Sequence, residues 1–131
     1  MKNLQLSLKR KWFEMTRDGI KTEDYREITP YWCGRLLMLQ GLPMYTKTFE
    51  ILKADPELPF VEMIGQLAGK SELTFKSFYT TTLTLGYPSA TDTARIIKFE
   101  HAGIEIRTGN PEWGAEAGKL YFVIKHGKRI Q

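Results

Sequence analysis

Hydrophobic and polar residues follow two different periods in the first part of the chain. Residues 4–8 alternate leucine with polar side chains, which is the period of a half-buried strand. From Trp12 to Ile20 apolar positions recur at three- and four-residue steps, so the pattern predicts a helix over about residues 9–18. Gly19 follows as a left-handed stop for that helix. The chain therefore begins with a strand and a helix.

A second strand and a second helix are expected next. Alternation over residues 22–27 predicts a strand with Asp24 and Arg26 on the same face. The Thr-Pro pair at 29–30 is a favourable helix start, because threonine caps the free N–H groups and proline fits the first turn. The helix that follows is expected to extend toward Leu39.

The middle of the chain has a less regular pattern. Prolines and glycines interrupt residues 41–72, and two short helices are expected there, over about 48–53 and 60–67. The stretch shows no repeat and no low-complexity bias, so we expect it to be ordered. It could be an insertion that covers one mouth of a barrel or widens a binding groove.

The second half of the chain is rich in strand-forming residues. Threonine and aromatic residues dominate 74–85, and turn residues follow at once. Further strands are expected over residues 94–100, 104–107 and 120–125. The His-Ala-Gly run at 101–103 is typical of a hairpin or of a bulged corner.

Together these elements define a fold class. The chain has 131 residues, of which 42% are hydrophobic, and this is the size and composition of one domain with a real core. Short strands with glycine-marked corners, combined with a few helices, predict a single α+β domain over residues 1–131. We expect a small, partly closed β-barrel of five or six strands with two or more short helices.

Composition limits the expected cellular location and the metals or cofactors that the chain could bind. Cys33 is the only cysteine, so no disulfide can form within the chain and a cytoplasmic location is expected. Lysines and arginines interrupt the start of the chain, so neither a signal peptide nor a membrane span is expected. The two histidines lie far apart, without the spacing of zinc ligands. We therefore expect no metal and no cofactor, and the oligomeric state stays open.

Positive charge and aromatic rings are concentrated near the start of the chain. The first 35 residues hold eight Lys/Arg against five Asp/Glu, within a net charge of +4 for the whole chain. Cations bind phosphates and aromatic rings stack on bases, so this mixture predicts RNA or a nucleotide as the partner. The residues expected to bind it are Lys21, Arg26, Tyr31, Arg35 and Trp113, with Tyr25 and Trp32 as further stacking surfaces.

The run Gly-Ile-Lys-Thr-Glu-Asp-Tyr-Arg-Glu at 19–27, followed by Thr-Pro-Tyr-Trp at 29–32, resembles the motif of the ASCH domain family in its phage-type and bacterial small-protein form. The likeness covers residues 4–36 and 83–128. It implies a barrel of the pseudouridine-synthase-and-archaeosine-transglycosylase-like (PUA-like) class that binds RNA or a nucleotide. One departure from the motif is that Asp24 occupies the position of the family's glutamate.

The resemblance also implies an alternative function. Small bacterial relatives in this family are amidohydrolases that remove acyl groups from cytidine, and other members have been assigned ribonuclease activity. Carried over to this chain, the catalytic residues would be Lys21, Asp24 in place of a threonine, and a glutamate on a later strand. Glu100 is favoured for that glutamate, and Glu105 is the other candidate. A third function class is a protein-interaction module that docks through the middle segment.

Overall fold

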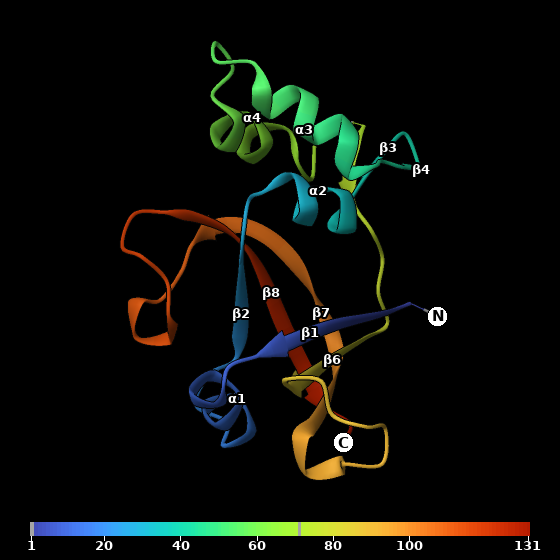
Figure 1. The fold of residues 1–131 in the computed structure, drawn as a ribbon, viewed down its shortest axis with the longest axis vertical. Helices are drawn as coiled ribbons and strands as arrows, with labels where there is room; N and C mark the ends of the chain where they lie inside the picture. Colours follow the sequence, from blue (N-terminus) through green and yellow to red (C-terminus); the bar gives the residue numbers. More distant parts are fainter. Residues whose placement is uncertain (1, 71) are drawn as a thin grey trace.

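The computed structural model describes residues 2–70 and 72–131, and its centre is a five-stranded sheet curled into a half-barrel (Figure 1). The strand order in this sheet is β1-β6-β7-β8-β2. Strands β1 and β6 are parallel, and the other neighbouring pairs are antiparallel. The five strands are β1 (Asn3–Leu8), β2 (Glu23–Glu27), β6 (Thr80–Leu85), β7 (Ile96–Thr108) and β8 (Leu120–Arg129). The expected α+β fold with a partly closed barrel is confirmed.

The first two helices begin and end where the sequence indicates. Helix α1 (Arg10–Arg17) is followed by Gly19 with a φ of 77°, a left-handed conformation that glycine adopts without strain. Helix α2 (Pro30–Leu36) starts with the Thr29 hydroxyl accepting a hydrogen bond from the backbone N–H of Trp32. It does not extend toward Leu39, because the backbone becomes extended after Leu36 and enters a strand.

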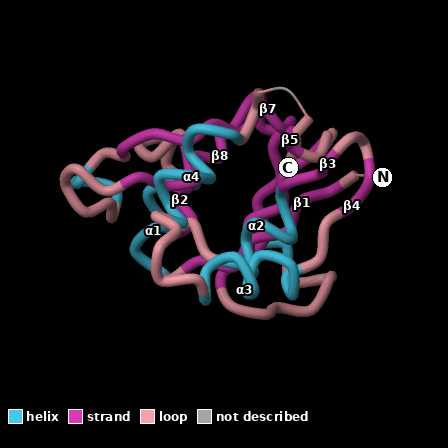
Figure 2. Tube along the Cα trace, turned by 90° about the horizontal axis from the view of Figure 1, so that it is seen from above, coloured by secondary structure: helices cyan, strands magenta, loops and turns pink. Residues whose placement is uncertain are grey.

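The middle of the chain forms a small unit of its own above the barrel (Figure 1). It contains helices α3 (Thr46–Ala54) and α4 (Phe60–Leu67), close to the two expected helices, and a small sheet in the order β4-β3-β5. The three strands are β3 (Leu37–Leu39), β4 (Leu42–Pro43) and β5 (Leu73–Phe75). Figure 2 views the molecule from above, so that this unit overlies the curled strands. Ser71, which belongs to the predicted middle segment, lies outside the described residues.

Two strand predictions need correction. Residues 96–108 form one long strand rather than two strands joined by a hairpin, and the pairing of β7 with β8 shifts on both sides of His101. Of the two expected forms the bulged corner is the correct one, and Gly103 in it has a φ of 111°. The segment 74–85 is two strands instead of one. Strand β5 pairs in the small sheet and β6 pairs in the barrel, so the chain must leave one sheet before it enters the other.

Strand β8 lies at the centre of the packing. Residues 121–124 are all buried, so both of its faces are covered. Phe122 and Ile124 pack into the main core with β1 and β6, whereas Tyr121 and Val123 pack with Ala115 on the opposite face. The loop between β7 and β8 provides that second cover, which period-2 alternation alone does not predict.

Strands β1 and β2 are the two edges of the curled sheet, and a side chain joins them. Arg26 on β2 donates a hydrogen bond from Nη2 to the backbone carbonyl of Ser7 on β1, over 2.9 Å. We call the line along which these two edge strands face each other the seam. No helix among the residues that the structure describes has both the length and the apolar character needed to cross a bilayer.

Two glycines inside helices differ in how closely neighbouring segments pack against them. A Cβ on Gly34 of α2 would lie 2.9 Å from the backbone nitrogen of Thr46 at the start of α3, whereas a Cβ on Gly65 of α4 would meet only side chains, at 3.5 Å or more. We expect Gly34→Ala to lower the free energy of unfolding by about 1–3 kcal/mol through overpacking.

The matched change Gly65→Ala should raise that free energy by about 0.5–1 kcal/mol, because alanine favours the helix and has room. Urea denaturation followed by circular dichroism measures both. Equal effects of the two substitutions would show that α2 and α3 do not pack this closely.

Candidate functional site

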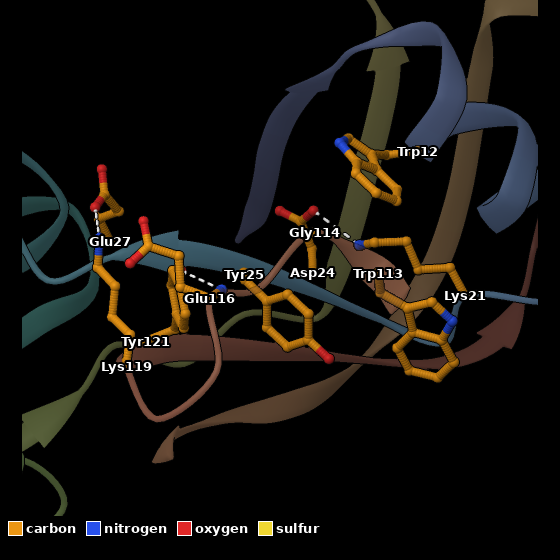
Figure 3. Close-up of a pocket in the computed structure, with 10 residues that line it drawn as sticks. All are labelled: Trp12, Lys21, Asp24, Tyr25, Glu27, Trp113, Gly114, Glu116, Lys119 and Tyr121. Carbon is orange, nitrogen blue, oxygen red and sulfur yellow. Dashed lines mark hydrogen bonds and ion pairs between the residues drawn. The ribbon is translucent and has the colours of Figure 1, made fainter. Parts of the chain in front are cut away.

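The first of two clefts beside strand β2 contains the lysine and the aspartate of the motif. It has a volume of about 310 Å³. Its lining comes from α1, the turn before β2, β2 itself, β8 and the loop before β8, namely Trp12, Lys21, Asp24, Tyr25, Glu27, Trp113, Gly114, Glu116, Lys119 and Tyr121. Figure 3 shows Trp12 and Trp113 on either side of the Lys21–Asp24 pair. We call this hollow the first cleft.

Lys21 is held with its charged end inside the protein. It follows the turn at Gly19, and its residue is only 3% exposed. Its Nζ donates to the backbone carbonyl of Glu23 over 2.6 Å and to Oδ1 of Asp24 over 3.3 Å. A lysine ammonium has three hydrogens, so these two contacts leave one, and Nζ also lies 5.3 Å from the centroid of the Tyr25 ring that lines the cleft. Burial lowers the pKa of Lys21, although the Asp24 carboxylate opposes that shift.

Asp24 connects Lys21 to a second cation. It is 4% exposed, and its two carboxylate oxygens have different partners. Oδ1 takes the Lys21 ammonium, while Oδ2 accepts a 2.7 Å hydrogen bond from Nε of Arg26. Asp24 and Arg26 are thus on one face of β2, as the alternation predicted. The same arginine continues to Ser7, so the chain of contacts runs from Lys21 across the seam.

The loop that carries Trp113 is fixed against β2 by hydrogen bonds. The Tyr25 hydroxyl donates to Glu23 over 2.7 Å and accepts from the backbone N–H of Asn110 over 2.9 Å. Arg107 donates to both oxygens of Glu23, over 2.6 and 3.0 Å. These bonds place the short 3₁₀ turn η2 (Pro111–Trp113) at the mouth of the first cleft.

Gly114 brings this turn against helix α1. Its φ is 99°, and a Cβ there would lie 2.9 Å from Cζ2 of Trp12. Only glycine fits this position without moving the indole. The two tryptophan-bearing segments, far apart in the sequence, therefore form one wall of the cleft.

A second cleft lies on the other side of the Asp24–Arg26 pair. It has a volume of about 390 Å³ and is lined by Gln5, Ser7, Arg26, Tyr31, Trp32, Arg35, Thr84 and Tyr87. Two guanidinium groups flank one indole, since the Cζ atoms of Arg26 and Arg35 lie 5.0 and 5.1 Å from the Trp32 ring centroid. Arg35 also donates to the Tyr31 hydroxyl over 3.2 Å. We call this the second cleft.

A histidine lies behind the first cleft. His126 on β8 stacks on Phe99 with 4.9 Å between ring centroids, and both of its ring nitrogens are buried without a hydrogen-bond partner among the described residues. Burial lowers the pKa of His126 to about 4, and the charges nearest to it include Asp24 and Lys21. The ring is therefore neutral at pH 7.

The structure divides the sequence-predicted residues between the two clefts. Lys21, Asp24 and Trp113 line the first, whereas Arg26, Tyr31 and Arg35 line the second. The Asp24–Arg26 ion pair connects the two groups.

Neither later-strand glutamate joins this site. Glu100 is exposed where β7 pairs with the start of β6, and it lines neither cleft. The Glu105 carboxylate is bound by Arg107 over 2.6 Å and lies 3.6 Å from Lys125. The bulge at residues 99–104 separates the two positions along β7. The structure therefore brings neither candidate glutamate of this strand beside Lys21 and Asp24.

Some cleft residues were not among the predicted site residues. Trp12 was counted only as an apolar helix position, and Tyr121 only as part of an alternating strand. His126 was considered as a zinc ligand and was rejected because of its spacing from His101. Across residues 2–70 and 72–131, no three His, Cys, Asp or Glu side chains gather as ligands for a metal ion. Burial raises the pKa of the Cys33 thiol to about 12, so this cysteine stays protonated.

Comparison of the chain with models of protein families, with curated proteins and with solved structures gives no match.

Acid titration tests the environment of His126. Its pKa is about 4 in the folded protein and 6.5 when exposed, so only the unfolded chain takes up this proton between those values. Stability should therefore fall as the pH drops from about 6.5 to 4. At ~1.4 kcal/mol per pKa unit the loss approaches about 3 kcal/mol.

The variant His126→Phe keeps a ring against Phe99 but has no proton to bind. Urea denaturation between pH 7 and pH 4.5 should show a smaller loss of stability in this variant than in the unmodified protein. Parallel pH curves for the two proteins would mean that His126 is accessible to protons in the fold.

Proposed function

We propose that this protein binds RNA or a nucleotide through the first cleft, with a base held by Lys21 and Asp24. The observation that carries the proposal is the pairing of a buried donor and a buried acceptor 3.3 Å apart in an aromatic cleft. Base edges present hydrogen-bond donors and acceptors side by side, so this pair matches them. A carboxylate suits an exocyclic amine, and an ammonium suits a ring nitrogen or carbonyl.

The cleft also fits a base in size and lining. Its volume of about 310 Å³ is at the lower end of small-molecule pockets, so a base with part of its sugar would fill it. Trp12, Trp113, Tyr25 and Tyr121 supply apolar ring surface around the polar pair. A base in a duplex cannot reach such a site, and the proposal therefore favours single-stranded or loop RNA. The resemblance to the ASCH motif and the curled sheet support the same function.

Removing one stacking ring tests the proposal. A base–aromatic stack contributes about 1–3 kcal/mol, so Trp113→Leu should weaken binding of a short single-stranded RNA by roughly tenfold or more. Fluorescence anisotropy with a labelled hexanucleotide at low salt measures the affinity.

Tyr79→Leu is the matched control, because Tyr79 is 74% exposed and lines neither cleft. It should leave binding unchanged. No binding by the unmodified protein at low salt, or equal losses in both variants, would contradict the proposal.

Hydrolysis of a modified nucleoside is the second candidate function, and the burial of Lys21 favours it. A lysine can act as a general base only when its pKa approaches the working pH, and burial moves the pKa of Lys21 in that direction. The hydrogen bond from Lys21 to Asp24 acts against it by favouring the charged form. Binding without turnover is therefore the leading proposal.

Replacement of Lys21 separates the two functions. Arginine does not give up its proton near neutral pH, so Lys21→Arg should abolish turnover of N4-acetylcytidine if the lysine is the base. Binding would be weakened far less, because the positive charge beside Asp24 is kept. The control Lys128→Arg changes an exposed lysine that lines neither cleft. If the unmodified protein shows no turnover of this substrate, the amidohydrolase alternative fails.

A further inference from the structure

We infer that the second cleft is a phosphate subsite, which binds a phosphate attached to the nucleoside in the first cleft. The inference rests on the proposed function of the first cleft and adds the chemical class of the ligand to it. The phosphate could belong to a mononucleotide or to an RNA chain, and the experiment below distinguishes these two sources.

The two clefts differ in charge. The first is lined by Lys21 and Lys119 together with Asp24, Glu27 and Glu116, so its cations are balanced by acids. The lining of the second contains two arginines and, among the residues that the structure describes, no Asp or Glu. Arg26 shares the Asp24 carboxylate with Lys21, whereas Arg35 has no acidic partner among the described residues. A balanced cleft suits an uncharged base and sugar, and a cleft with this surplus of guanidinium charge suits an anion.

The ion pair at the seam places the two clefts next to each other. Asp24 lines the first cleft, Arg26 lines the second, and Oδ2 of Asp24 is 2.7 Å from Nε of Arg26. A ligand that extends from one cleft to the other therefore passes the Asp24–Arg26 pair. The sugar-phosphate link of a nucleotide provides such an extension.

The arginines keep donors for a ligand. A guanidinium has five N–H groups, and Arg26 uses one on Asp24 and one on Ser7. Arg35 uses one on the Tyr31 hydroxyl. Because both guanidinium groups lie within 5.1 Å of the Trp32 ring, the indole supports them without neutralising their charge.

Neighbouring cations strengthen the field at the second cleft. Burial first, and then the charges of Arg35 and Lys2, lower the pKa of Lys76. Lys76 lies beside α2, because its Nζ donates to the backbone carbonyl of Gly34 over 3.1 Å. Tyr87, which is 94% exposed, and Tyr31, which is 52% exposed, add ring surface at the same cleft. A base next to the phosphate could stack there.

The inference also changes the role expected for Lys21. The sequence suggested that Lys21, Arg26 and Arg35 would all meet phosphates. In the structure the Lys21 ammonium is bound to the Asp24 carboxylate and lies in the balanced cleft, so it suits a base. Arg26 and Arg35 are therefore the residues that bind the phosphate in this inference.

Calorimetric titration tests the subsite with four probes: cytidine, cytidine 5′-monophosphate, cytidine 3′-monophosphate and the dinucleotide CpC. Hydrogen bonds to charged groups contribute enough for at least one monophosphate to bind about tenfold tighter than cytidine at low salt. In Arg35→Gln the monophosphate should bind only about twofold tighter than cytidine, while the affinity for cytidine itself stays the same. Unchanged cytidine binding also shows that the variant is folded.

The control Lys128→Gln removes the same unit of charge from an exposed lysine that lines neither cleft, and it should keep the full gain. Tighter binding of CpC than of either monophosphate would identify an RNA chain as the source of the phosphate, and equal binding would identify a mononucleotide.

Two results overturn the inference but leave the proposed function standing. One is equal affinity for cytidine and for all the phosphate-bearing probes, and the other is a gain that Arg35→Gln does not reduce. If none of the four probes binds, and single-stranded RNA does not bind either, the proposed function fails together with the inference.

Discussion

The carboxylate of Asp24 is the group on which the arrangement of the site depends. A buried carboxylate needs partners, because desolvation of an unpaired charge costs several kcal/mol. Here one oxygen takes the Lys21 ammonium and the other takes the Arg26 guanidinium. The guanidinium also bonds to Ser7 on the opposite edge strand. One acid therefore fixes the turn after α1, orients β2 and joins the two edges of the curled sheet.

This interaction also explains why the clefts have different chemical characters. Because Asp24 neutralises Lys21 in the first cleft, that cleft offers a donor and an acceptor with little net charge. Arg26 shares Asp24 with Lys21 and faces the second cleft beside Arg35, and no Asp or Glu lines that cleft among the described residues. A nucleotide has the same division, with an uncharged base at one end and an anionic phosphate at the other. The proposed function and the phosphate subsite follow from this match between the protein and one class of ligand.

Local patterns predicted much of the fold because local physics determines it. The alternation at residues 4–8, the cap at Thr29 and the stop at Gly19 all appear in the structure. The alternation of β2 placed Asp24 and Arg26 on one face. The wall formed by Trp12 and Gly114 could not be predicted, because it joins segments about a hundred residues apart. The continuation of β7 through its bulge is likewise set by pairing with the next strand, β8, and not by the residues at the bulge itself. Glu100 was favoured as a catalytic residue by its position on a strand pattern, which does not determine whether a side chain reaches a cleft.

The three tryptophans provide the most direct measurement, since Trp12 and Trp113 line the first cleft and Trp32 lines the second. Their indole N–H signals can be followed separately by ¹H–¹⁵N NMR during a titration. With cytidine, the signals of Trp12 and Trp113 should shift while that of Trp32 stays in place. With a cytidine monophosphate that reaches the second cleft, all three should shift. Binding that moves none of these signals, or that moves Trp32 alone with the nucleoside, would contradict a base held beside Lys21 and Asp24.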